Sequence, residues 1–568
     1  MTTMLDSFSV DTGKRELLKL CKDVSGSQEI YAACFHGPRV YDHADEESNI
    51  DVLLVVREYR PKMAAFTEKT KDACLSIIAV DQQIFEGDVK QGDFGESVAE
   101  AIVFPYHSWI NGDYLEEMEV RIKRRYALEL LRNIVLKYPE LSSELLIRPE
   151  YFMYEVLRRM TKLFPSLKPG FSSIFRKKAR KRNISLIMRG FNRALAELEK
   201  DKYIVISDGY IRMDEKLIET TKNQRKKLTD IMTSVRKAVL PYTRSFFSKV
   251  MIGFLRNQRF SIRSSSQDTK WKLPKAIEDA ERFLLAPTPL GPIPLSDKTS
   301  IEGFVRKTVP SGETFEIEIR KLGGVLNSVF LLDIQKRNKT QKVVVKRFED
   351  WLGFKWLPLA LWTVGTQSFA VLGDRRLQRE YSVNQFLGRH GFRVPQILYM
   401  SIKERMIFEE FVEGEKLNDI IKRLIGSSSE NATSLGEIIE DVGKEIAKAH
   451  TLGVSFGDCK PENILYTDER RICFLDLEQA TRNGNKTWDL AEFLYYSGHY
   501  FPPLNSDSAA KVIARSFING YQAAGGSKES VRLVASAKYT KVFSIFTMPH
   551  IILAMANICR EMGTDRKR

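Results

Sequence analysis

The chain has 568 residues, of which 43% are hydrophobic and 28% charged, and its excess of Lys and Arg gives a net charge of +15. This length is too great for one hydrophobic core, and the composition excludes a disordered chain. The basic charge favours polyanionic partners such as nucleotides or nucleic acid without choosing among them.

The first segment, residues 1–114, is predicted to be a small α/β domain. Continuous apolar runs of strand length occupy residues 49–58 and 74–85. The stretch between them, KMAAFTEKTKDA, has a helical pattern of apolar residues. We therefore expect a strand, a helix and a second strand in this order.

Within this domain, CFHGPRVYDHADEESNIDVLLVV places Gly37 in a turn before a strand that begins near Asn49 and Asp51. This arrangement resembles the nucleotidyltransferase superfamily, in which two carboxylates flank one strand residue and bridge two Mg²⁺ ions. Asp81 is the candidate third carboxylate. Because Asn49 replaces one charged ligand, the resemblance implies the fold, with nucleotide binding, RNA binding or assembly as its role.

Residues 115–240 are predicted to be mainly helical. Residues 184–213 read as a helix, a strand, an Asp-Gly turn and a second strand, which is the shape of a winged-helix wing. The basic run FRKKARKR, residues 175–182, carries six positive charges. It favours contact with RNA or DNA phosphates, and a solvated basic loop is the equally weighted alternative.

Residues 241–300 are predicted to be a linker region because they end in the proline-rich APTPLGPIPLSDKTS. Residues 301–568 follow as a β-rich segment and then a helical one. In the β-rich segment, strands flank a turn with Gly323 and Gly324, and Lys346 ends the run VVVK. Such glycines let backbone N–H groups approach phosphates, and a lysine on a strand can reach them.

Farther along, Glu380 lies on an amphipathic helix from which it could pair with Lys346, although an ordinary solvated charge is the alternative. The segment RMIFEEFVEGEKL predicts a strand that runs into a connector. Backbone groups of the connector, at Glu410 and Val412, are candidates for hydrogen bonds to an adenine.

The segment FGDCKPENILYTDERRICFLDLEQA combines a hairpin pattern with four polar residues. The hairpin should bring Asn463 beside Asp476, and their oxygen atoms suit Mg²⁺. Asp458 would accept a hydroxyl proton, and Lys460 would neutralise charge on a transferring phosphoryl group.

The order of these motifs resembles the protein-kinase superfamily, in both its serine/threonine and its atypical Bud32-type members. The resemblance implies that Lys346 and Glu380 position the phosphates of ATP, that Asp458 is the base, and that Asn463 and Asp476 bind Mg²⁺. Two departures mark an atypical member: Phe456-Gly457 replaces His-Arg, and Leu477-Glu478 replaces Phe-Gly.

The fold is therefore predicted to be multidomain, α/β and α+β, with a C-terminal bilobal kinase-like domain. The predicted function is phosphoryl transfer from ATP, with Mg²⁺, to a serine or threonine hydroxyl of a protein. The alternatives are a small-molecule or RNA-linked kinase, and a nucleic-acid-binding scaffold whose kinase fold responds to ATP.

Six scattered cysteines without a Cys-x-x-Cys pair argue against a zinc or disulfide framework and favour a reducing compartment. The N-terminus lacks a basic segment followed by an apolar run, so no signal peptide is predicted. Residues 542–559 are the most apolar window, but Pro549 and His550 favour a buried helix. We expect a cytoplasmic protein without a membrane partner.

Overall fold

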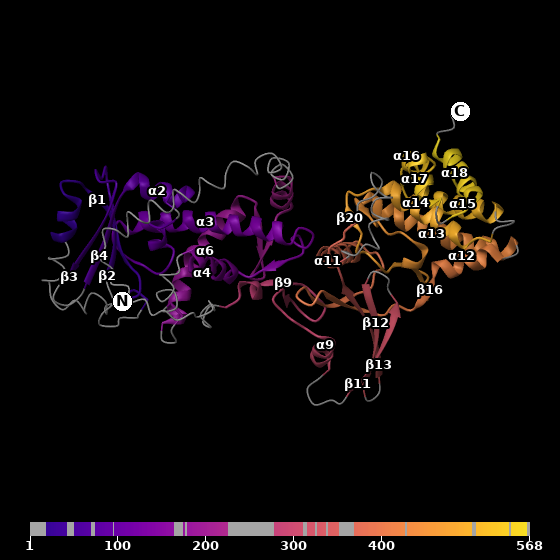
Figure 1. Cartoon of the computed structure of the whole chain (residues 1–568), viewed down its shortest axis with the longest axis horizontal. Helices are drawn as coiled ribbons and strands as arrows, with labels where there is room; N and C mark the ends of the chain where they lie inside the picture. The colour runs from indigo at the N-terminus through magenta and orange to yellow at the C-terminus, as the bar shows by residue number, and fades with distance from the viewer. Residues whose placement is uncertain are drawn as a thin grey trace. The chain divides into compact units, whose positions relative to one another are not determined.

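The computed structural model describes most of the chain, as two compact units that comprise Met1–Leu284 and Leu285–Arg568. Each unit contains a five-stranded sheet and several helices (Figure 1). The described residues are 19–41, 50–69, 74–94, 96–163, 174–175, 179–224, 278–309, 315–323, 327–336, 339–350, 369–426, 429–502, 507–544 and 547–564.

The first unit begins with a five-stranded sheet of order β3-β4-β2-β1-β5. Strands β2 and β4 run parallel, whereas the other neighbours are antiparallel. Both faces of β2 are buried, with Val52 and Leu54 on one face and Leu53 and Val55 on the other, which explains the continuous apolar run of the sequence. The strands are β1 (Ile30–His36), β2 (Ile50–Val56), β3 (Met63–Lys69), β4 (Cys74–Asp81) and β5 (His107–Ile110).

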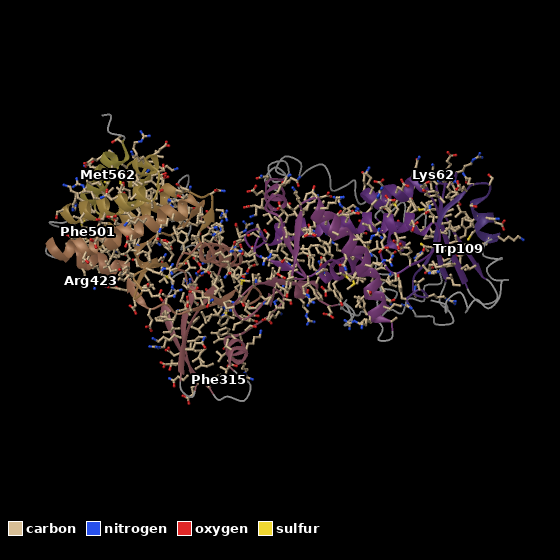
Figure 2. All side chains as sticks on the ribbon, turned by 180° about the vertical axis from the view of Figure 1, so that it is seen from behind. Lys62, Trp109, Phe315, Arg423, Phe501 and Met562 are labelled. Carbon is tan, nitrogen blue, oxygen red and sulfur yellow. The ribbon has the colours of Figure 1, made fainter. Side chains whose placement is uncertain are left out.

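The helix predicted between the two apolar runs was wrong. Met63–Lys69 instead forms strand β3, which pairs antiparallel with β4 along its whole length. Figure 2 labels Lys62, directly before this strand, and Trp109 on β5. Strand β3 lies at the edge of the sheet, and pairing with β4 on one side gives it an extended conformation, so that tertiary context overrides the local helical pattern.

Helices dominate the rest of the first unit: α2 (Gln82–Gln91), the short 3-10 helix η1 (Ala99–Ile102), α3 (Gly112–Lys137), α4 (Glu150–Leu163) and α6 (Arg180–Lys200). The predicted helix and hairpin are confirmed: α6 precedes β7 (Ile204–Ser207), which pairs with β8 (Tyr210–Met213). Asp208 and Gly209 between them both have positive φ, as a two-residue hairpin turn requires. The winged-helix domain itself stays a prediction.

The second unit contains a five-stranded antiparallel sheet of order β11-β12-β13-β15-β14. Ile293, from the predicted linker, packs in its core with Phe304 and Val305 of α9. The described end of that linker region is therefore part of a folded unit, while residues 241–277 lie outside the described residues. The elements are β9 (Leu284–Ala286), β10 (Ile293–Pro294), α9 (Ile301–Thr308), β11 (Phe315–Gly323), β12 (Asn327–Lys336), β13 (Lys339–Phe348), α11 (Gly373–Arg389), β14 (Ile397–Ser401) and β15 (Met406–Glu410).

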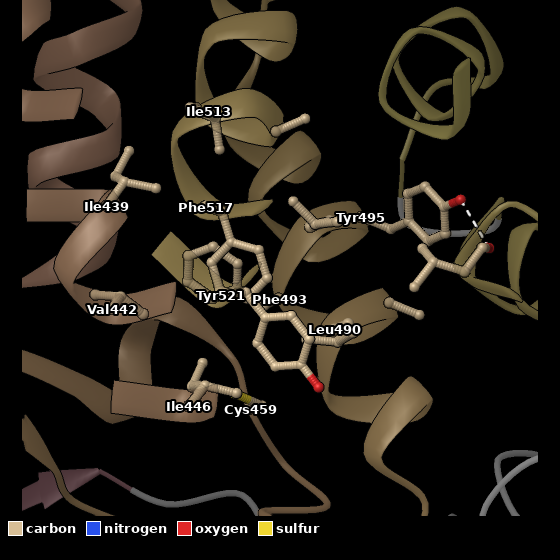
Figure 3. Packing of buried hydrophobic residues seen from close by; sticks show 14 of the residues in the cluster. Ile439, Val442, Ile446, Cys459, Leu490, Phe493, Tyr495, Ile513, Phe517 and Tyr521 are labelled. Carbon is tan, nitrogen blue, oxygen red and sulfur yellow. Dashed lines mark hydrogen bonds between the residues drawn. The ribbon is translucent and has the colours of Figure 1, made fainter. Parts of the chain in front are cut away.

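The helical part of the second unit has a large apolar core, seen in Figure 3, to which Ile446, Phe493 and Phe517 contribute. Most of its helices and short strands follow the connector after β15. They are β16 (Gly414–Lys416), α12 (Leu417–Gly426), α13 (Ser429–Thr451), β17 (Val454–Ser455), η4 (Pro461–Asn463), β18 (Ile464–Thr467), β19 (Ile472–Phe474), β20 (Thr481–Arg482), α14 (Lys486–Ser497), η5 (Gly498–Tyr500), α15 (Asp507–Ala523), α16 (Lys528–Val534), α17 (Ala537–Phe543) and α18 (Pro549–Gly563).

Two glycines allow α13 and α15 to cross at short range. A Cβ atom on Gly520 would lie 1.9 Å from the carbonyl oxygen of Glu440, and one on Gly443 would lie 2.2 Å from that of Phe517. Helix α13 leads directly to the segment that carries Asp458, so this crossing supports the candidate site. In the part of the chain that is described, no helix is long and apolar enough to cross a membrane.

Candidate active site

Lys346 and Glu380 meet in the interior of the second unit. Lys346 lies on the central strand β13 and Glu380 on helix α11, and the lysine Nζ is 2.8 Å from Glu380 Oε1. Both side chains are buried, with 9% and 1% of their surface exposed. The predicted pairing of these two residues is thus present in the structure.

A second carboxylate, which the sequence did not reveal, also binds this lysine. Glu409 Oε1 lies 3.2 Å from Lys346 Nζ, since β15 pairs with β13 and directs Glu409 toward the same point. Its other oxygen, Oε2, has no hydrogen-bond partner among the described residues. The lysine further donates to the carbonyl oxygen of Leu475, 2.6 Å away. Glu409 directly precedes the connector. In the sequence, only the presence of an acidic residue at the end of an apolar strand could have indicated its role.

The pKa values of Lys346, Glu380 and Glu409 are all raised, for different physical reasons. Burial raises the pKa of Glu380 to about 8, against the opposing effect of Lys346, and burial raises the pKa of Glu409 to about 7. Burial alone would lower the pKa of Lys346, but Glu380, Glu409 and Asp476 together raise it well above its usual value. Lys346 therefore stays charged amid an excess of carboxylates.

The segment with Asp458 forms the second part of the site. Lys460 Nζ lies 2.6 Å from Asp458 Oδ1. The side-chain amide of Asn463 donates to the Asp458 backbone oxygen at 3.0 Å and to its Oδ2 at 3.1 Å. The carboxylate of Asp458 is thus held from two sides while its side chain remains 19% exposed.

The predicted hairpin connects this segment to Asp476. Strands β18 and β19 pair from Ile464 with Phe474 onward, and the N–H of Leu475 donates to the Asn463 carbonyl oxygen at 2.9 Å. The backbones of Asn463 and the residue before Asp476 are therefore adjacent, as the sequence predicted.

Asp489 of α14 organises the backbone just before Asp458. Its two carboxylate oxygens accept the N–H groups of Phe456 and Gly457, each at 2.7 Å. His450 of α13 contacts the same carboxylate at 2.9 Å. Charged acceptors make the stronger backbone hydrogen bonds, so this buried aspartate fixes the path of the chain into Asp458.

A further buried acid, Glu492, lies one helical turn along α14 and was not predicted. It accepts the N–H of Cys459 at 2.8 Å and the indole N–H of Trp488 at 3.0 Å. Burial and the nearby Asp458 carboxylate raise its pKa well above the usual value. Asp489 and Glu492 therefore hold the backbone amides of the two residues before Asp458 and of the residue after it.

The residues predicted to bind Mg²⁺ supply oxygen ligands but do not by themselves form a complete cation site. Among the described residues, no three or more His, Cys, Asp or Glu side chains are grouped as a complete metal site. Four interacting carboxylates, however, face only two cations, a net charge of −2 when all are ionised; they are Glu380, Glu409, Asp476 and Glu478, with Lys346 and Arg376. A divalent cation near Asn463 and Asp476 would relieve this excess.

Some of the residues predicted to contact the nucleotide can be located in the structure. Gly323 ends β11 opposite Val329, next to a bulge, whereas Gly324 lies outside the described residues. The Glu410 N–H already donates to the Gln396 carbonyl oxygen at 2.9 Å. An adenine at the connector would therefore have to use the carbonyl group of Glu410 together with Val412.

The N-terminal carboxylates do not converge as predicted. In the parallel register of β2 and β4, Asp51 faces Ser76, whereas Asp81 faces Val56. Five residues separate these positions along each strand, about 16 Å. Asp81 instead caps α2 by accepting the Gln83 N–H at 3.1 Å. The prediction of Asp81 as a third carboxylate for Asp51 was wrong, because a sequence gives no strand register.

Other residues surround Asp51 at the start of β2. Gly37 has positive φ, and a Cβ atom there would lie 2.3 Å from Asp51 Oδ2, so the turn requires glycine. Burial raises the pKa of Asp51 to about 6, and burial with the Asp51 charge raises that of Glu100 to about 7. Asn49 lies outside the described residues.

The basic run of residues 175–182 is only partly described, because 176–178 lie outside the described residues. Two of its arginines are engaged within the first unit. Arg180 pairs with Glu278 at 2.9 Å, and Arg182 donates to the Val40 carbonyl oxygen at 3.1 Å. The ion pair with Glu278 offsets the charge of Arg180, whereas Arg182 keeps its charge because its partner is a neutral carbonyl group.

Comparison with known proteins supports a kinase-like domain. The lipopolysaccharide kinase (Kdo/WaaP) family matches residues 335–497, a range that includes Lys346, Glu380 and Asp458. The match covers less than half of the chain.

Individual relatives match shorter stretches. A probable serine/threonine-protein kinase of Clostridium perfringens is 36% identical over 97 residues, 17% of this chain and 14% of its own length. A probable serine/threonine-protein kinase of Archaeoglobus fulgidus, a BUD32 homolog, is 27% identical over 158 residues, 28% of this chain and 71% of its own. Bud32, a KEOPS complex subunit of Pyrococcus abyssi, is 27% identical over 109 residues, 19% of this chain and 46% of its own.

These matches confirm two predictions at a coarse level: a protein-kinase-like domain in the C-terminal half, and a kinase-type phosphotransferase as its enzyme class. The chain spans between 14% and 71% of the length of these relatives. Substrates and partners therefore belong to the proposals below.

Proposed function

We propose that the C-terminal unit transfers the γ-phosphoryl group of ATP, with Mg²⁺, to a serine or threonine hydroxyl of a protein. The proposal is supported by the Asp458–Lys460 pair, by the hydrogen bond from Asn463 to Asp458, and by the hairpin whose second strand leads to Asp476. The buried pair of Lys346 and Glu380 supports it from the sheet.

In this mechanism Asp458 accepts the proton of the acceptor hydroxyl as its oxygen forms a bond to the γ-phosphorus. The bond from that phosphorus to the bridging oxygen of ADP breaks, and ADP leaves with the electron pair. Lys460 neutralises charge on the transferring group, and Lys346 binds an α- or β-phosphate oxygen. Bound Mg²⁺, with Asn463 and Asp476 as ligands, would neutralise the phosphate charge.

Two observations bear on the acceptor. Two of the relatives are named as probable serine/threonine-protein kinases, which supports a protein hydroxyl. The family match names lipopolysaccharide kinases, and only residues 477–485 separate Asp476 from α14, a short platform for a peptide. A carbohydrate or other small-molecule hydroxyl is therefore the second candidate, and an RNA-linked acceptor the third.

The test is phosphate transfer from γ-labelled ATP to protein, carbohydrate and RNA acceptors. Asp458→Asn should lower the rate by about 10²- to 10⁴-fold, the usual contribution of a general base. Asp468→Asn, an exposed acid in the turn of the same hairpin, is the matched control. Transfer by Asp458→Asn at the wild-type rate would refute the assignment, and the labelled acceptor class decides between the candidates.

For the N-terminal part we propose a nucleotidyltransferase-like module in residues 1–114 and a helical, winged-helix-like region in residues 115–240. Asp51 and Asp81 lie at opposite ends of their strands, so they are not placed to share metal ions for catalysis. The role that we propose for this part is therefore to bind a nucleotide or RNA. Changing the three basic residues at 176–178 to Gln should weaken RNA binding and reduce its salt dependence. Unchanged binding in a filter assay would contradict this role.

A further inference from the structure

The residue that replaces the usual glycine after Asp476 is itself fully engaged. Both oxygens of Glu478 lie 3.0 Å from Nη1 of Arg376. The side-chain amide of Asn327 donates to Glu478, and its oxygen accepts from Arg376 at 2.6 Å. Glu478 and Arg376 are buried and Asn327 is partly buried, so the ion pair of this polar cluster is shielded from solvent.

Each member of this Asn327–Arg376–Glu478 cluster comes from a different part of the site. Asn327 is the first residue of β12, the strand that follows Gly323 and Gly324 in the sequence. Arg376 lies one helical turn before Glu380 on α11, and Glu478 follows Asp476 by two residues. The cluster therefore connects the candidate phosphate turn, the helix of the lysine partner and the segment of the metal ligand.

The neighbours of Glu478 are tied to the same helix. The Leu477 N–H donates to Glu380 Oε2 at 2.7 Å. Gln479 accepts the Ala370 N–H at 2.8 Å and donates to the Ala370 carbonyl oxygen at 3.2 Å. Three consecutive residues after Asp476 thus bind α11 or the residues just before it, whereas a glycine at 478 would contribute no side chain.

Stability alone does not account for a buried ion pair. Removing two charges from water costs several kcal/mol, and uncharged replacements of similar size are often neutral or stabilising. What such a pair supplies is a fixed geometry between the elements that carry it. The geometry here concerns the parts of the site that would contact phosphates and metal.

We propose that Glu478, Arg376 and Asn327 are positioning residues that fix the Asp476 segment against α11 and the start of β12 in the arrangement that binds Mg·ATP. This rests on the proposed function, because it concerns the same nucleotide site. The cluster positions the residues that would bind the phosphates and the metal. Adenosine has no phosphate groups, so its binding should not depend on the cluster.

The test compares the full-length wild type with the double variant Arg376→Met/Glu478→Gln, which removes both buried charges and leaves neither one unpaired. The dissociation constants of Mg·ATP and of adenosine are measured by ligand-induced shifts of the melting temperature. We expect about tenfold weaker Mg·ATP binding, equivalent to about 1.4 kcal/mol, with unchanged adenosine binding. Asn327→Ala, which keeps the ion pair, should weaken Mg·ATP binding less.

The control is Arg320→Gln, which removes an ion pair with Asp333 between strands β11 and β12 outside the cluster. Equal loss of Mg·ATP and adenosine binding would indicate a structural role and overturn the proposal, as would unchanged Mg·ATP binding. Wild type that binds Mg·ATP but phosphorylates no acceptor would refute the proposed function while the positioning role remained measurable.

Discussion

The ammonium group of Lys346 is shared by two buried carboxylates, at 2.8 Å from Glu380 and 3.2 Å from Glu409. Either acid alone can keep the ammonium group of Lys346 charged and fixed in position. The pairing that the sequence suggested is therefore one half of a redundant arrangement.

This redundancy predicts a non-additive pair of substitutions. Glu380→Gln alone should lower kcat/KM by about tenfold, because Glu409 continues to hold Lys346, whereas Glu380→Gln/Glu409→Gln should lower it by about 10³-fold. Steady-state kinetics with varied ATP checks this, with the exposed Glu413→Gln as control. If Glu380→Gln alone is as inactive as the double variant, Glu409 does not substitute for it.

The backbone before Asp458 should depend on Asp489. Asp489→Asn replaces one acceptor oxygen with an amide donor opposite a backbone N–H, and each hydrogen bond to a charged group contributes about 1.5–3 kcal/mol. We expect kcat to fall by about 10- to 100-fold while the dissociation constant of Mg·ATP stays near wild type. Asp441→Asn on the exposed face of α13 is the control. A change in nucleotide affinity without a change in kcat would argue against this role.

The crossing of α13 and α15 should not tolerate a methyl group. Gly520→Ala would place Cβ 1.9 Å from the Glu440 carbonyl oxygen, so the helices must separate, at a cost of about 3 kcal/mol or more in the free energy of unfolding. Gly426→Ala at the end of α12, where a Cβ atom meets nothing within 4 Å, should be neutral or slightly stabilising. Denaturant unfolding of both variants checks this, and equal stabilities would contradict the close crossing.

The stability of the first unit should depend on pH through Asp51. Because burial raises the pKa of Asp51 from 3.8 to about 6, its protonated form favours the folded state below about pH 4. That contribution is lost as the pH rises through 6. Asp51→Asn does not titrate, so at pH 8 it should be more stable than wild type by roughly 1 kcal/mol, allowing for partial exposure.

Denaturant unfolding of wild type and Asp51→Asn at pH 4 and pH 8 measures the difference. Burial lowers the pKa of the neighbouring His36 to about 4, which acts in the opposite direction as the pH falls, but this effect is common to both proteins. The exposed Asp23→Asn provides the control. If wild type and Asp51→Asn differ in stability by the same amount at pH 4 and at pH 8, the titration of Asp51 does not affect stability.

Local patterns in the sequence correctly predicted hairpins and turns, because interactions between neighbouring residues determine these structures. The hairpin between Asn463 and Asp476 follows from alternating apolar residues around a turn, and the Asp208-Gly209 turn from the residues that allow positive φ. Strand β3 escaped prediction because its conformation comes from pairing with β4. The register that separates Asp51 from Asp81 likewise depends on which strands become neighbours.

Contacts between distant segments were beyond prediction for the same reason. Glu478 and Arg376 are 102 positions apart, and nothing near either residue indicates the other. The sequence marked Glu478 only as a departure from a motif. Glu409 similarly stood in an apolar strand whose partner strand carries Lys346.

The buried carboxylate of Glu409 has a consequence for inhibitor chemistry. Its oxygen Oε2 has no hydrogen-bond partner among the described residues, and it directly precedes the connector at which the adenine is proposed to bind. A compound that extends from the adenine position with an amidine or a primary amine could form an ion pair there. A probe of this site should therefore direct a hydrogen-bond donor toward Glu409 Oε2 and keep its own positive charge away from the ammonium group of Lys346.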